Sequence, residues 1–228
     1  MWQMLIYKSW METRLKLLYA LLLIGGSSAL MFSVGAKAPR SQAVVTAQFV
    51  LLLLAGTLSG SGIKTQPAFT ATKGLHGSTY YTLSLPVARL LLLATRATVG
   101  WLELTFGLGL QMCGLWALSR SGVGSIEPSG MLGHAAVMLA CGTWLYFTGV
   151  FMDTFLDEQW RNQGTLVMFA LLLWLSSHTP DAINIFKAMN EASPLLGHAM
   201  PWGAMAFSFG MASVMFFAAW KVIERREY

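Results

Sequence analysis

Three carboxylic acids stand out because they lie within or directly after strongly apolar runs. Glu103 lies in the run 90–118, and Asp153 and Asp157 follow the run 131–151, one helical turn apart. An ionisable side chain inside a membrane span costs at least a few kcal/mol, so it usually faces protein or water. Two carboxylates at this spacing can bind Mg²⁺. Arg161 follows one turn later, however, and favours a charge pair at the end of a helix.

Glu103 belongs to a stripe of polar residues and glycines. Helical spacings of three and four place Gly100, Gly107 and Gln111 on its face, with Arg96 two turns earlier. Small residues let helices approach closely, so this face is expected to point toward another helix or a pathway rather than lipid. Two interpretations stay open. The five residues line a substrate pathway or gate, or they form a structural ion pair or hydrogen bond within a helix bundle.

Other sites with recognisable chemistry are not indicated. The four histidines, His76, His134, His178 and His198, lack the spacing of metal ligands. Cys113 and Cys141 lie in apolar runs and are expected to be buried packing residues. The chain contains no G-x-x-x-x-G-K-[ST] motif and therefore no P-loop for ATP. We expect neither a metal nor a cofactor in this chain.

The amino-acid composition indicates the class of fold that positions these residues. Of 228 residues, 55% are hydrophobic and 11% are charged, against about 25% charged in soluble domains. The fold class expected is all-α, a polytopic membrane protein with a single domain over residues 1–228. The net charge of +5 fits basic residues that flank spans and face anionic lipid, rather than nucleic-acid binding.

Apolar runs predict about six transmembrane helices. They cover residues 17–34, 41–62, 90–118 (beginning as early as 86), 131–151, 164–177 and 202–222. Residues 1–16 are amphipathic and predict a helix in the membrane interface. An N-terminus in the cytoplasm puts most Lys and Arg residues on the cytoplasmic side, with both termini inside. The Gly35-Ala36-Lys37-Ala38 stretch resembles a signal-peptidase site, so a cleaved signal peptide is an alternative for the first span.

A helical element is expected at residues 178–201, on the extracellular side in this topology. Asp181 is predicted to cap a short helix whose buried face carries Ala182, Ile185, Phe186 and Met189. Ser193-Pro194 is predicted to break that helix before the last span.

The loop 63–89 is basic, contains no acidic residue, and ends in a Ser84-Leu85-Pro86 helix start. Its middle, 75–85, is uncharged at neutral pH and rich in Tyr and Leu. An apolar surface on a cytoplasmic loop needs a partner or the membrane to cover it.

The run KGLHGSTYYTLSLPVARLLLLATRATVGWLE, from Lys73 to Glu103, resembles the permease subunits of ABC-2 type ABC transporters. The family's glycine step and Leu-x-Leu-Pro-Val-Ser-Arg-like segment correspond to Gly77, Ser78, Leu83, Leu85, Pro86, Val87 and Arg89. Lys73 stands where the family often has an acidic residue, and Ala88 stands where it usually has serine. The layout of interfacial helix, six spans and a helical element before the last span is also similar.

The resemblance implies a transport subunit of the cell inner membrane, without enzymatic activity of its own. The loop 63–89 would be a coupling element that docks on a separate ATPase subunit, which binds ATP and Mg²⁺. The coupling residues implied are Lys73, His76, Tyr80, Tyr81, Leu83, Leu85, Pro86 and Arg89. Two permease chains, as a homodimer or with a related permease, would join two ATPases, most often for export.

Two other functions remain open. One is a membrane-embedded enzyme or electron-transfer anchor that uses Glu103 or the Asp153/Asp157 pair. The other is an assembly subunit without transport activity. They differ from the permease in their partners, because only the permease requires a P-loop ATPase.

Overall fold

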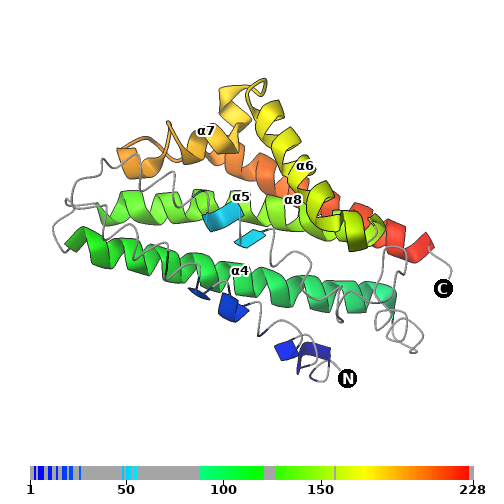
Figure 1. Ribbon diagram of the computed structural model, residues 1–228. Helices are drawn as coiled ribbons and strands as arrows, with labels where there is room; N and C mark the ends of the chain where they lie inside the picture. Colours follow the sequence, from blue (N-terminus) through cyan, green and yellow to red (C-terminus); the bar gives the residue numbers. More distant parts are fainter. Residues whose placement is uncertain are drawn as a thin grey trace.

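The computed structural model describes residues 88–120, 127–156 and 158–225, together with scattered positions between residues 3 and 55. The regular elements in this part of the chain are helices, in agreement with the predicted all-α class. Four are long: α4 (Arg89–Arg120), α5 (Pro128–Phe155), α6 (Glu158–Ser176) and α8 (Trp202–Arg225). Three short helices lie between α6 and α8: η1 (Asp181–Ile183), α7 (Ile185–Met189) and η2 (Pro194–Leu196) (Figure 1).

Three of the long helices are long and apolar enough to cross a membrane, consistent with a membrane protein. They cover Leu90–Ala117, Pro128–Thr154 and Trp202–Arg225, and coincide with the predicted spans 90–118, 131–151 and 202–222. The apolar part of α6, Leu166–Ser176, rises only about 17 Å, against a hydrocarbon core of about 30 Å. The predicted spans 17–34 and 41–62 fall almost entirely outside the described residues. The expected number of six spans is therefore not confirmed.

Helix α5 lies at the centre of the described structure. It packs against α4, α6, α7, η2 and α8, and its contact with α8 is the most extensive. Helices α4 and α5 run side by side in opposite directions (Figure 1). Two hydrogen bonds between the helices fit this antiparallel arrangement. Tyr146 of α5 bonds to Ala97 of α4, and Trp101 of α4 bonds to Thr143 of α5. Pro128 begins α5 at a position where its missing N–H costs little.

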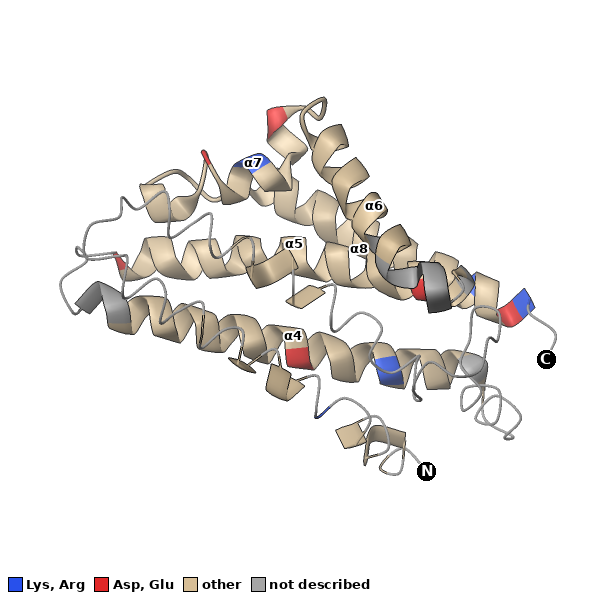
Figure 2. Ribbon diagram, in the orientation of Figure 1, with Lys and Arg blue, Asp and Glu red and all other residues tan. Residues whose placement is uncertain are grey.

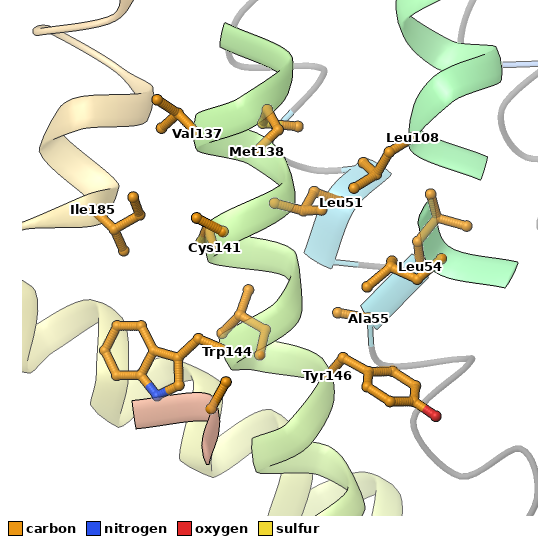
Figure 3. Packing of buried hydrophobic residues seen from close by; sticks show 14 of the residues in the cluster. Leu51, Leu54, Ala55, Leu108, Val137, Met138, Cys141, Trp144, Tyr146 and Ile185 are labelled. Carbon is orange, nitrogen blue, oxygen red and sulfur yellow. The ribbon is translucent and has the colours of Figure 1, made fainter. Parts of the chain in front are cut away.

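The core lies between these helices and includes residues of the N-terminal part of the chain. Leu51 and Leu54 are fully buried between α4 and α5 (Figure 3). Gly142 of α5 makes room for Leu51 and for Leu104 of α4, because a Cβ there would lie 2.8 Å from Leu51 Cδ1 and 3.5 Å from Leu104 Cδ2. Cys141 is buried in this core as predicted, but Cys113 is exposed on α4, so the predicted burial of Cys113 is wrong.

The 178–201 segment is helical and interrupted as predicted, but its details differ. Asp181 does not cap a helix. It pairs with Lys187 at 2.7 Å, while Asn184 caps α7 by accepting from the Lys187 N–H. Ala182 is exposed, so it does not belong to the buried face, which is formed instead by the residues Ile185, Ala188 and Met189 of α7. Ser193 caps η2 and Pro194 begins it, which places the break where the sequence predicts it.

Candidate functional site

The polar stripe of α4 is buried. Arg96, Glu103 and Gln111 expose only 6%, 4% and 2% of their surface. Gly107 is buried as well. Figure 2 shows how sparse charged residues are along α4 and α5. Within the described residues the structure thus brings the five residues predicted as a pathway or gate to one inward-facing side of α4.

At Gly100, the side chain of Tyr146 from α5 lies directly against the backbone of α4. A Cβ at this position would collide with the hydroxyl of Tyr146, and would lie 3.1 Å from its Cζ and 3.3 Å from its Cε2. The Tyr146 hydroxyl donates a hydrogen bond of 3.1 Å to the Ala97 carbonyl oxygen. One turn along, Trp101 Nε1 donates to Thr143 Oγ1 at 2.9 Å. The absence of a side chain at Gly100 therefore lets a fully buried tyrosine bond to the backbone of the neighbouring helix.

Two buried carboxyl groups lie near Tyr146. Its hydroxyl lies within electrostatic range of Glu103 on α4 and of Asp153 on α5, and Asp153 exposes only 1% of its surface. Arg96, Glu103 and Asp153 each take part in a hydrogen bond, ion pair or other electrostatic interaction. Buried charges persist only when they are compensated in this way. The interface between α4 and α5 thus contains a polar centre within helices that are otherwise apolar.

An open surface pocket of about 410 Å³ includes Glu103 in its lining. Its walls are Val99, Leu102 and Phe106 of α4 together with Ile6, Trp10 and Leu17 from the N-terminal part of the chain. Glu103 is the one ionisable residue in this lining. Glu103 therefore lies between this open, mostly apolar pocket and the buried hydroxyl of Tyr146.

A second buried polar contact joins α5 to the 178–201 segment. His134 Nδ1 and Ser193 Oγ lie 2.8 Å apart, and both residues are fully buried. Ser193 Oγ also accepts from the Leu195 N–H at 3.2 Å, which caps η2. Gly130 makes this docking possible, because a Cβ there would lie 2.7 Å from the Pro194 carbonyl oxygen. His134 thus joins α5 to the 178–201 segment through a buried polar contact.

The structure does not describe all of the predicted site residues. Asp157 and the coupling residues Lys73, His76, Tyr80, Tyr81, Leu83, Leu85 and Pro86 lie outside the described residues. Arg89 is the first residue of α4. Among the described side chains there is no group of three or more His, Cys, Asp or Glu residues arranged to hold a metal ion.

Sequence reasoning missed Tyr146, although it is the centre of the α4–α5 interface. A tyrosine in the middle of an apolar span was the available signal, since its hydroxyl needs a partner when buried. Comparison with family models, with characterised proteins and with solved structures found no match.

Proposed function

We propose that this chain is the permease subunit of an ATP-driven ABC-2 type transporter, working as an exporter. The observation that carries the proposal is the run from Lys73 to Glu103, which resembles ABC-2 permeases and leads directly into α4. Helix α4 has the length and apolar character of a membrane span and carries the buried Arg96 and Glu103 on one face. A permease requires such a polar face because its substrate must cross the membrane away from lipid.

The proposed topology is multi-pass in the cell inner membrane, with six spans and both termini in the cytoplasm. The loop 63–89 then lies in the cytoplasm and the 178–201 segment on the outside.

The proposed complex contains two permease chains, as a homodimer or with a related permease, and two ATPase subunits. ATP and Mg²⁺ bind to the ATPase, and closure of the ATPase dimer moves the loop 63–89. This motion passes to α4, because the loop is continuous with that helix. A movement of α4 against α5 would strain the hydrogen bonds of Tyr146 and Trp101, because these bonds join the two helices.

Co-purification tests the proposal. The tagged chain, solubilised gently from its native membrane, is expected to bring down a protein with a P-loop. Tyr80→Asp and Leu83→Asp are expected to abolish this association without loss of membrane insertion. Leu196→Asp is the matched control, because Leu196 is an exposed leucine of η2 on the opposite side of the proposed topology.

Recovery of the intact chain without any ATPase, from cells in which it is functional, would contradict the proposal. ATPase binding by the two loop variants at the wild-type level would also contradict the coupling role of 63–89.

A further inference from the structure

The 178–201 segment is held on α5 by a buried polar contact and by close packing around it. Ser193 Oγ lies 2.8 Å from His134 Nδ1, and both side chains are fully buried. Gly133 provides room beside them, because a Cβ there would lie 2.8 Å from Pro194 Cβ. The imidazole of His134 is therefore shielded from solvent only while the segment is docked.

The hydrogen bonds around His134 suit a neutral imidazole. Ser193 Oγ accepts from the Leu195 N–H at 3.2 Å, so its own hydroxyl hydrogen is left to donate to His134 Nδ1. A neutral imidazole has one accepting nitrogen, and Nδ1 fills that role here. Nε2 is buried and has no hydrogen-bond partner within the part of the chain that the structure describes.

A proton on His134 would remove the acceptor and add a buried charge. Both ring nitrogens of an imidazolium are donors, so Nδ1 could no longer accept from Ser193. A buried charge is stable only when it is paired and hydrogen-bonded, and breaking this condition is strongly destabilising. Docking of the segment would then be weakened both by the lost hydrogen bond and by the uncompensated charge.

No acid in the described part of the chain forms an ion pair with His134. The acids of the elements around it are exposed or lie at least three helical turns away: Glu103, Glu127, Asp153, Asp181, Glu191 and Glu224. The cations of these elements, which offer no compensation, are Arg96, Lys187, Lys221 and Arg225. Cys141, two turns along the same face of α5, is a buried thiol.

We propose that His134 is a pH switch for the 178–201 segment, which docks on α5 while His134 is neutral and is released when His134 gains a proton. The docked state then binds one proton fewer than the released state, so its stability falls as the pH falls. A released histidine has an ordinary pKa of about 6.5, which places the onset of release just below neutral pH. The switch concerns docking alone and goes beyond the proposed function without resting on it.

Amide hydrogen exchange of the purified full chain in neutral detergent, followed by mass spectrometry, measures this release. Protection factors of peptides from 190–200 are compared at about pH 7.5 and about pH 5, after correction for the intrinsic exchange rate. Linkage to one proton predicts a roughly thirtyfold fall, because only the released state takes up a proton in this range. Peptides from 90–118 in α4 should keep their protection. Unchanged protection of 190–200 in the wild-type chain would overturn the proposal.

Two variants identify the residue responsible. His134→Asn places an amide oxygen where Nδ1 accepts from Ser193, and the amide gains no proton in this range, so protection of 190–200 should be the same at both pH values. The double variant His178→Asn/His198→Asn is the matched control. It removes the other two histidines of the described residues, both exposed, and should retain the wild-type fall.

A thirtyfold fall that persists in His134→Asn would overturn the proposal, and so would loss of the fall in the double variant. The double variant leaves His134 in place, so it decides the question even where His134→Asn does not fold. Neither result depends on an ATPase, so failure of the switch and failure of the permease assignment are distinguished.

Discussion

Replacement of Gly100 by alanine is expected to be among the most damaging single-methyl changes in the described helices. The added Cβ would occupy the position of the Tyr146 hydroxyl. Tyr146 is fully buried, so its ring must move within a packed interface, at a cost of about 1–3 kcal/mol. Its hydrogen bond to the Ala97 carbonyl is lost at the same time, which adds about 1 kcal/mol. The total expected for Gly100→Ala is about 2–4 kcal/mol.

A double-mutant cycle with Tyr146→Phe isolates this contact. Tyr146→Phe alone removes the hydrogen bond and should cost about 1 kcal/mol. In the double variant the hydroxyl is gone, and the nearest ring atoms, Cζ and Cε2, lie 3.1 Å and 3.3 Å from the new Cβ, so only a small shift is needed. We expect the double variant to be less destabilised than Gly100→Ala alone, with a coupling of about 2 kcal/mol.

The assay is reversible unfolding of the detergent-solubilised chain by increasing fractions of sodium dodecyl sulfate, followed by circular dichroism. Gly109→Ala is the matched control on the same helix, because nothing lies within 4 Å of the position of its Cβ. Its free energy of unfolding should stay near the wild-type value or rise slightly. Unchanged stability of Gly100→Ala, or additive costs in the double variant, would refute the packing of Tyr146 over Gly100.

Two further predictions concern the 178–201 segment. Gly203→Ala should loosen its docking on α8, because the new Cβ would lie 2.6 Å from the Ala182 carbonyl oxygen, whereas Gly210→Ala on the same helix meets nothing within 4 Å. Limited proteolysis at 178–201 should become faster in Gly203→Ala only, and equal rates in both variants would contradict the contact. The hydrogen bond to Asp181 raises the pKa of Lys187, so the pair stabilises the segment below the ordinary lysine pKa of 10.5 and loses this effect as the pH rises through the raised value. Lys187→Gln should therefore differ slightly from wild type in thermal stability at neutral pH and converge with it in strong alkali. A difference that persists there would contradict the ion pair.

The helices α4, α5 and α8 could be predicted from the sequence because each is a long apolar run ended by charged or turn-forming residues. Helix α6 was harder to place, since the polar residues 158–164 continue its helix beyond the apolar part Leu166–Ser176. Length and hydropathy predict a span, but they do not predict how far a helix extends past it.

The inward face of α4 could be predicted from helical spacing. A charged or amide side chain on an apolar helix is costly to expose to lipid, so it faces the protein interior. Tyr146 could not be paired with Gly100 in the same way. Their contact depends on the register between two helices, and that register is set by packing of residues far apart in the chain. Asp181 shows a similar limit: the sequence predicted that it caps a helix, but its carboxylate pairs with Lys187 instead.

The central position of α5 has a consequence for assembly in the membrane. Its buried side carries His134, Thr143, Thr148 and Asp153, and these groups are covered only when α4, α8 and the 178–201 segment are in place. In the proposed membrane topology, α5 enters the bilayer before α8 has been synthesised, and its polar side then faces lipid or an insertion factor. We expect α5 to remain next to the insertion machinery until α8 has been translated. Chains truncated before residue 202 should accordingly be recognised and degraded by membrane quality control.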